Sequence, residues 1–303
     1  MINLSTGAFF EGATRQMGSL RERANELQGQ IGTGERLSRS SDDPVAAARL
    51  RTLARRERLS QVDQSNSDRA LIDLQLTDNA LLSMADLVIR AKELSMQASS
   101  QAMGVEQRQL LNAELSGLID SLLVIANTRN GAGQALFGGQ APGLAYQDTG
   151  AGITYVGTAS AEEVAIGDGQ TVTRALTGPE TLSFDYGGAT TNVFAVLGAL
   201  STALQNPAAD QFGAAQLAMG GLDASLQQIT TSQTIVGARM GWVEILDQRR
   251  ETTGEFAAEE RADIGGADLA TTMTHLQEIL TVLEASQASF VRLSSLSLFD
   301  QLR

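Results

Sequence analysis

Residues 42–50 read DDPVAAARL, and they mark the start of a helix around which the rest of the fold is built. The side chain of Asp42 or Asp43 can accept a hydrogen bond from a free amide of the first turn. Pro44 suits the first helical position, because the amide there needs no partner. No stop signal follows before Gly104. About sixty residues at 1.5 Å each predict a helix roughly 90 Å long, which is a rod and not a compact domain.

Apolar residues before and after this long helix repeat with the alternating spacing of three and four that is typical of helices packed along one another. Before it, Leu20, Leu27 and Ile31 belong to one such stripe. After it, a stripe from Leu111 to Ile125 predicts a third helix. The N-terminal part of the chain is therefore expected to be helical.

The C-terminal third shows the same spacing twice. One stripe runs from Leu222 to Val243 and a second from Leu269 to Phe290. Residues 265–266, both glycines, separate the two stripes, and Asp268 can cap the helix that follows. The second stripe is expected to need a partner, because it continues into an apolar tail with few charges. This tail contains Leu293, Leu296, Leu298 and Phe299.

Between residues 134 and 192 the pattern changes to short runs rich in Val, Ile, Thr, Tyr and Phe, separated by glycine pairs, Asp-Gly and Pro. Two-residue periodicity with such turns predicts strands and hairpins, and GDGQ at residues 167–170 is interpreted as a hairpin turn. Helical spacing returns from Val193 to Leu204. The expected fold is mainly α with inserted β: an elongated antiparallel helical bundle formed by both chain ends, residues 1–133 and 208–303, plus a small central β-containing domain, residues 134–207.

Composition and charge disfavour several classes of protein. The formal net charge of -13 and a pI near 4.6 argue against nucleic acid as a partner, since phosphate binding requires a basic surface. The chain has no cysteine, so it can form neither a disulfide nor a thiolate site. We expect no membrane span, because no stretch approaches about twenty apolar residues, and no cleaved secretory leader.

Candidate chemistry is sparse. The single histidine, His275, lies off the predicted apolar stripes, and we interpret it as a surface residue. Trp242 is interpreted as a packing residue. Adjacent carboxylates at residues 162–163 and 259–260 are typical of solvated surface positions. The sequence therefore predicts no enzyme, no cofactor and no metal site.

Five arginines crowd the start of the long helix. Three interpretations remain open: a solvated helix face, an interface with an acidic neighbouring subunit and, least favoured by the net charge, nucleic acid. The arginines are Arg49, Arg51, Arg55, Arg56 and Arg58.

The stretch GTGERLSRSSDDPVAAARL, Gly32–Leu50, resembles the N-terminal signature of the flagellin superfamily. Pro44 followed by Val-Ala-Ala, and the opening INLSTGAFF, resemble its hook–filament junction members more than filament flagellins. The ending DLATTMTHLQEILTVLEASQASFVRLSSLSLFDQL is similar to the last helix of the family, and ALFGGQAP to its entry into the β domain. Glu35 departs from the pattern, which usually has a lysine or arginine there.

This resemblance implies a structural subunit that polymerises helically into the junction layer of the extracellular bacterial flagellum. It also implies export through the flagellar type III apparatus with a cognate chaperone. The implied partners are other copies of the chain, the other hook-associated junction protein and flagellin. The alternatives are a filament flagellin and, as a different class, a ligand-binding β domain or an enzyme on a helical stalk. The residues expected at the assembly interface are Leu20, Leu27, Ile31, Asp42, Asp43, Pro44, Arg49, Arg55, Leu276, Leu283, Phe290, Leu293, Leu296, Leu298 and Phe299.

Overall fold

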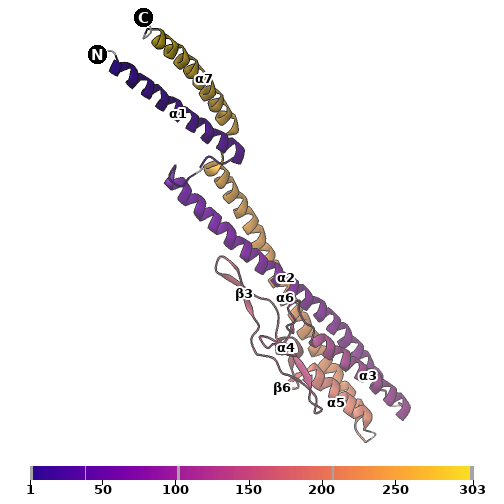
Figure 1. The fold of residues 1–303 in the computed structure, drawn as a ribbon. Coiled ribbons are helices and arrows are strands. Elements are labelled where there is room, and N and C mark those ends of the chain that lie inside the picture. Colours follow the sequence, from indigo (N-terminus) through magenta and orange to yellow (C-terminus); the bar gives the residue numbers. More distant parts are fainter. Residues whose placement is uncertain (1–2, 38, 101–102, 207, 301–303) are drawn as a thin grey trace. The chain divides into compact units, whose positions relative to one another are not determined.

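The computed structural model describes residues 3–37, 39–100, 103–206 and 208–300, with the side chains of 3–7, 9 and 293–300 outside the description. Within these ranges the chain is mainly helical with inserted strands, as the apolar spacing predicts (Figure 1). The helices are α1 (Asn3–Thr33), α2 (Pro44–Ala98), α3 (Val105–Ala126), α4 (Gly178–Leu182), α5 (Val193–Gln205), α6 (Gln211–Gly265) and α7 (Leu269–Asp300).

The strands form three separate antiparallel hairpins. Tyr146 pairs with Tyr155 in the first, Val164 with Val172 in the second and Phe184 with Thr191 in the third. The second hairpin turns at residues 168–169, where Asp168 has φ 51° and Gly169 has φ 73°. Two consecutive positive φ angles define the tight turn that matches the twist of the flanking strands, so the predicted GDGQ turn is confirmed. The strands are β1 (Tyr146–Asp148), β2 (Ile153–Tyr155), β3 (Glu163–Gly167), β4 (Gln170–Thr173), β5 (Ser183–Tyr186) and β6 (Ala189–Asn192).

The chain divides into two compact units. Unit 1 comprises Met1–Arg58 and Thr252–Arg303, and unit 2 comprises Leu59–Glu251. The long helices α2 and α6 contribute residues to both. The three hairpins all belong to unit 2, and the expected limits of a central domain at residues 134 and 207 also fall inside it. That division into three domains stays a prediction.

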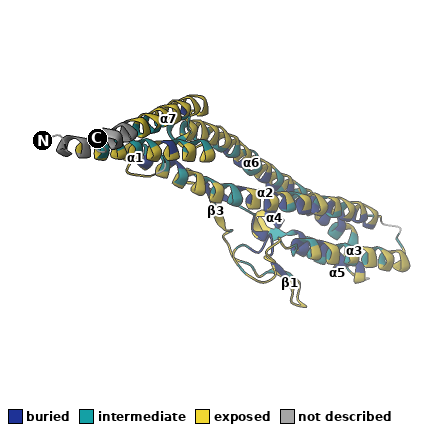
Figure 2. Cartoon of the chain, turned by 45° about the horizontal axis from the view of Figure 1, so that its top comes forward, coloured by how far each residue is buried: buried dark blue, intermediate teal, exposed yellow. Residues whose placement is uncertain are grey.

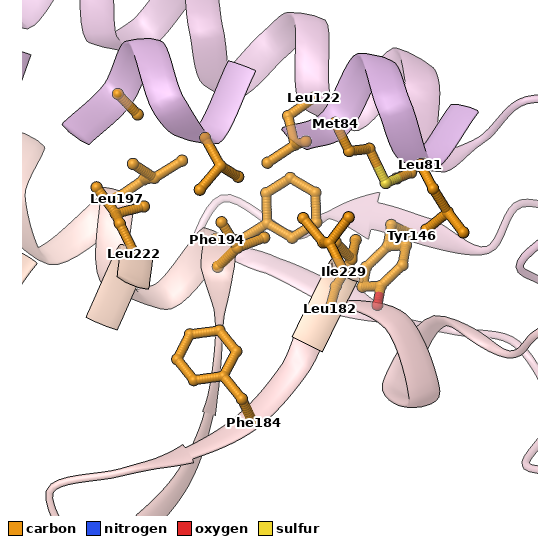
Figure 3. Packing of buried hydrophobic residues seen from close by; sticks show 14 of the residues in the cluster. Leu81, Met84, Leu122, Tyr146, Leu182, Phe184, Phe194, Leu197, Leu222 and Ile229 are labelled. Carbon is orange, nitrogen blue, oxygen red and sulfur yellow. The ribbon is translucent and has the colours of Figure 1, made fainter. Parts of the chain in front are cut away.

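Unit 2 is organised around one apolar core to which helices and strands both contribute. The core draws on α2, α3, α5 and α6 and on the hairpin segment between α3 and α5. Tyr146 is 1% exposed in this core, with its ring 5.2 Å from that of Phe194 and 5.3 Å from that of Tyr155. Figure 3 shows side chains of this core that come from six of the contributing elements: Leu81, Met84, Leu122, Tyr146, Leu182, Phe194, Leu197, Leu222 and Ile229.

Helix α3 is long and apolar enough to cross a membrane by length and composition alone. In this fold it packs on α5, and Leu115, Leu122 and Ala126 are buried in the common core. The same helix leaves Leu110 and Val124 each 72% exposed, so packing covers only part of its apolar surface.

A second, smaller core lies where the hairpin of β3 and β4 contacts α2 and α6. Ile166 and Val172 pack against Val243 there. Arg250 donates a hydrogen bond to the carbonyl of Ile166 at 2.5 Å, and Asn66 donates one to the carbonyl of Ala165 at 2.9 Å. The hairpin is therefore held on the helices by both apolar and polar contacts.

Two expectations about unit 2 are corrected by the structure. Helix α2 ends at Ala98 and not near Gly104. Gly104 instead precedes α3, and its amide donates a hydrogen bond to the side chain of Gln107 at 3.2 Å. Trp242 is 43% exposed, so it is not a core residue. Its neighbour Val243 occupies the buried position of that turn.

Candidate assembly interface

In unit 1 the two ends of the chain form an antiparallel pair of helices, α1 and α7. Near the outer end the rings of Phe10 and Phe290 meet edge to face, with centroids 5.2 Å apart. At the other end the backbones of Glu35 and Gly266 form an isolated antiparallel bridge. These two contacts fix the pairing as antiparallel, and Figure 1 shows both helices side by side.

The predicted stripes of α1 and α7 face one another but are only half covered. Ala24 and Thr272 are buried. A pair of helices can bury only one face of each, so the adjoining apolar residues are left in contact with water. The predicted interface residues that are partly buried in this pair are Leu20, Leu27, Ile31, Leu276, Leu283 and Phe290.

Helix α7 carries a further apolar face beside the one that contacts α1. Met273 is 58% exposed, and by helical geometry Leu269, Leu280 and Val291 lie on the same side of the helix. Figure 2 shows exposed residues along α7. The predicted tail residues Leu293, Leu296, Leu298 and Phe299 lie outside the described side chains.

The link between α1 and α2 is tied to the link between α6 and α7. Gly34, with φ 71°, lets the chain turn after α1. The amide of Arg36 then donates to the carbonyl of Gly265 at 2.7 Å, and the amide of Ala267 donates to the carbonyl of Gly34 at 2.9 Å. Backbone bonds of this kind place no requirement on the side chain of Glu35, which is exposed.

Arg36 adds a side-chain contact to the same link. Its guanidinium donates to the carbonyl of Ile264 at 2.9 Å and lies 3.7 Å from the carboxylate of Asp43. The contact stabilises the end of α6, where backbone carbonyls have no partner within the helix. Arg36 was not among the predicted interface residues, because its partner is distant in the sequence and only the fold brings it close.

The start of α2 follows the prediction from residues 42–50. Asp43 is the capping residue, since its carboxylate accepts a hydrogen bond from the amide of Ala46 at 3.0 Å. Pro44 is the first helical residue. Asp42 instead closes the preceding turn by accepting a hydrogen bond from the amide of Arg39 at 2.8 Å.

Helices α2 and α6 are joined in unit 1 by two ion pairs. The Nε and Nη2 atoms of Arg49 donate hydrogen bonds to the two carboxylate oxygens of Glu260, at 2.5 and 2.8 Å. The guanidinium of Arg261 lies 3.0 Å from the carboxylate of Glu57. The hydrogen bond from Arg49 lowers the pKa of Glu260 and raises its own pKa. Arg55 is exposed and makes no ion pair among the described residues.

Asp268, in the link between α6 and α7, caps the N-terminal end of α7. Its carboxylate accepts hydrogen bonds from the hydroxyl of Thr271 at 2.6 Å and from the amide of Ala270 at 3.1 Å. The bonds from Thr271, first its hydroxyl and then its amide, lower the pKa of Asp268. The predicted cap is confirmed.

Titratable side chains do not converge on a reaction centre in the described part of the chain. His275 is 61% exposed and lies 3.6 Å from Glu278 on the same helix. Among the residues that the structure describes, no group of three or more His, Asp or Glu side chains could hold a metal ion. Unit 1 instead has helices, α1 and α7, whose apolar residues are only partly buried.

Comparisons with known proteins agree with this architecture. The bacterial flagellin N-terminal helical region matches residues 5–141. The flagellar hook-associated protein 3 of Escherichia coli (strain K12) is 27% identical over 293 residues, which cover 89% of this chain and 90% of the relative. Flagellin E of Vibrio cholerae is 25% identical, but over 51% of this chain and 39% of its own length. The crystal structure of hook-associated protein 3 from Legionella pneumophila has a TM-score of 0.62 at 15% identity, covering 76% of this chain and 99% of that one.

The comparisons support a place for the chain in the flagellin superfamily. Within it the chain groups with the hook-associated proteins 3, since that match extends over nearly the whole chain whereas the flagellin match spans about half.

Proposed function

We propose that this chain is a non-enzymatic structural subunit of the extracellular bacterial flagellum, which assembles into the junction layer between hook and filament. The observation that carries the proposal is the end-to-end similarity to hook-associated protein 3, combined with an α1–α7 pair whose apolar faces are half covered. The other hook-associated junction protein and flagellin are the proposed neighbours in the flagellum. Export occurs through the flagellar type III apparatus after binding of a chaperone.

The exposed face of α7 is the proposed site of contact with neighbouring chains. Met273, Leu280 and Val291 expose apolar surface there. Burial of apolar surface is worth about 25 cal/mol per Å², so covering these residues favours association. Subunits that meet through different surfaces build rings or helical tubes.

The proposal is tested in a bacterium that lacks its own copy of the gene. Such cells should keep their hooks and secrete flagellin that does not assemble, and the full-length chain should restore filaments. A deletion of residues 293–303 should abolish incorporation while leaving the core of unit 2 folded. Normal assembly of the truncated chain would contradict the role given to the tail.

Two further measurements separate the alternatives. The paired substitution Met273→Gln and Leu280→Gln should reduce incorporation, whereas Ser289→Gln, at an exposed polar position about 160° of helical rotation from Met273, should not. A filament flagellin would grow long filaments from purified chain alone, and a junction subunit should not. Saturable binding of a small molecule by the full chain would favour the ligand-binding alternative.

A further inference from the structure

In unit 1 the outer sides of α2 and α6 carry opposite charges. Arg51, Arg55 and Arg58 are exposed and lie four and three residues apart, so they share one face of α2. We call them the arginine face. Glu255, Glu259 and Asp263 are exposed at intervals of four residues on α6, and we call them the acidic face. Neither face takes part in an ion pair among the described residues.

The inner contacts show that the arginine face points away from α6. Leu53 is buried, and Glu57 pairs with Arg261 of α6. Each of these two inner residues is two positions from Arg55, and two positions correspond to about 200° of helical rotation. The arginine face is therefore on the outer side of α2.

The same reasoning applies to the acidic face of α6. Arg261 points toward α2, since it pairs with Glu57. It lies two positions from both Glu259 and Asp263, so these two carboxylates are turned away from α2. The two helices thus hold a positive face and a negative face on opposite sides of one unit.

Each face is unfavourable alone. Like charges three and four residues apart on one helix repel one another, and an opposite charge brought beside them relieves the repulsion. The two stripes also match in length, about 10 Å for the arginine face and about 12 Å for the acidic face at 1.5 Å per residue. Nucleic acid is a poor occupant of the arginine face, since the chain has a net charge of -13.

We propose that the arginine face of one copy binds the acidic face of a second copy, so that neighbouring subunits associate side by side. This inference rests on the proposed function and specifies the partner of its assembly surface. The contact joins two different faces, so each copy keeps one free face of each sign. Repetition of such a contact closes a ring when the rotation between copies allows it.

Charge reversal in the full-length chain tests the contact in flagella purified from cells without their own copy of the gene. The first variant carries Arg51→Glu, Arg55→Glu and Arg58→Glu, and the second carries Glu255→Arg, Glu259→Arg and Asp263→Arg. Each should lower the amount of incorporated chain at least tenfold, because both of its faces then have the same sign.

The matched control combines all six substitutions and has the same net charge as the native chain. It should recover incorporation to within about twofold, and so should co-expression of the two single-face variants. Circular dichroism and secreted amounts verify that each variant folds and is exported. The inference is overturned if either variant with one reversed face is incorporated as well as the native chain. It is also overturned if the variant with all six substitutions does not recover incorporation.

Cross-linking supplies an independent readout, because the chain has no cysteine. A chain with both Arg55→Cys and Glu259→Cys should form a ladder of disulfide-linked copies in oxidised flagella, whereas either substitution alone should not. Absence of the ladder contradicts the contact. If the native chain itself is missing from the flagella, the proposed function fails; if it is present and the variants behave like it, only this inference fails.

Discussion

Asp43 accepts a hydrogen bond from the backbone amide of Ala46 across the first turn of α2, with 3.0 Å between the oxygen and the nitrogen. The residue between the cap and the second helical position is Pro44, which has no amide to satisfy. This cap sets the start of a 55-residue helix. It also places Asp43 within 3.7 Å of Arg36, and hence next to the link to α7.

Replacement of the cap should loosen the first turn of α2. Asp43→Ala should lower the free energy of unfolding by about 1 kcal/mol, since one first-turn amide loses its acceptor. Asp43→Asn keeps an acceptor and should lower it much less. Hydrogen exchange of the Ala46 amide measures the effect. Equal exchange in both variants would show that Asp43 does not act as the cap.

Acid should weaken unit 1. The pKa values of Asp268 and Glu260 are lowered in the folded chain, by hydrogen bonds from Thr271 and Arg49 respectively. The unfolded chain therefore binds more protons, and the stabilisation is complete above the ordinary values of 3.8 and 4.5. It is lost as the pH falls below these values and through the lowered pKa values.

Unit 2 contains a carboxylate with the opposite behaviour. Burial raises the pKa of Asp73, so its contribution to stability increases as the pH falls through the raised value. Thermal unfolding at pH 7 and pH 3 should separate the two units, because the single tryptophan, Trp242, reports on unit 2 and circular dichroism reports on all helices. Asp268→Asn should reduce the pH dependence of the dichroism signal. An unchanged pH dependence would refute this assignment.

Two leucines of α3 should differ sharply in their contribution to stability. Leu122 is 1% exposed in the core of unit 2, whereas Leu110 is 72% exposed on the same helix. Leu122→Ala should lower the free energy of unfolding by about 2–5 kcal/mol through lost burial and a cavity. Leu110→Ala should change it by less than about 0.5 kcal/mol. Urea denaturation measures both, and similar losses would place α3 outside the core.

Two neighbouring tyrosines should respond in opposite directions to loss of the hydroxyl. The Tyr146 hydroxyl is buried without a hydrogen-bond partner among the described residues, and burial raises its pKa. Tyr146→Phe should raise the free energy of unfolding by about 1 kcal/mol, since an unpaired polar group leaves the core. Tyr155 donates to the carbonyl of Thr158 at 2.6 Å, so Tyr155→Phe should lower it by about the same amount. Urea denaturation of both variants measures the sign of each change in the free energy of unfolding.

Local sequence signals predicted most of the helical fold. The cap at Asp43, the break at Gly265 and Gly266 and the cap at Asp268 each depend on neighbouring residues, and each is found in the structure. The turn at Asp168 is equally local. Such features need no knowledge of distant contacts.

Contacts between distant segments could not be predicted in the same way. Arg36 and Glu260 look like ordinary surface charges until the fold brings them to Ile264 and Arg49. Trp242 has an apolar side chain on a helix, but its direction depends on which face of α6 packs inward. The assignments of Leu20 and Arg55 to an assembly interface stay predictions, because the structure contains a single copy.

Unit 1 is formed by two segments that lie far apart in the sequence, and this limits when it can fold. Its helices come from the first 58 residues and from residues 252–303, so Phe10 cannot meet Phe290 until the end of the chain is present. Unit 2 is continuous in sequence and can form first. A chain that emerges from a narrow channel starting with residue 1 must hold its first helix unpaired throughout delivery. The α1–α7 pair can therefore form only after the whole chain has emerged.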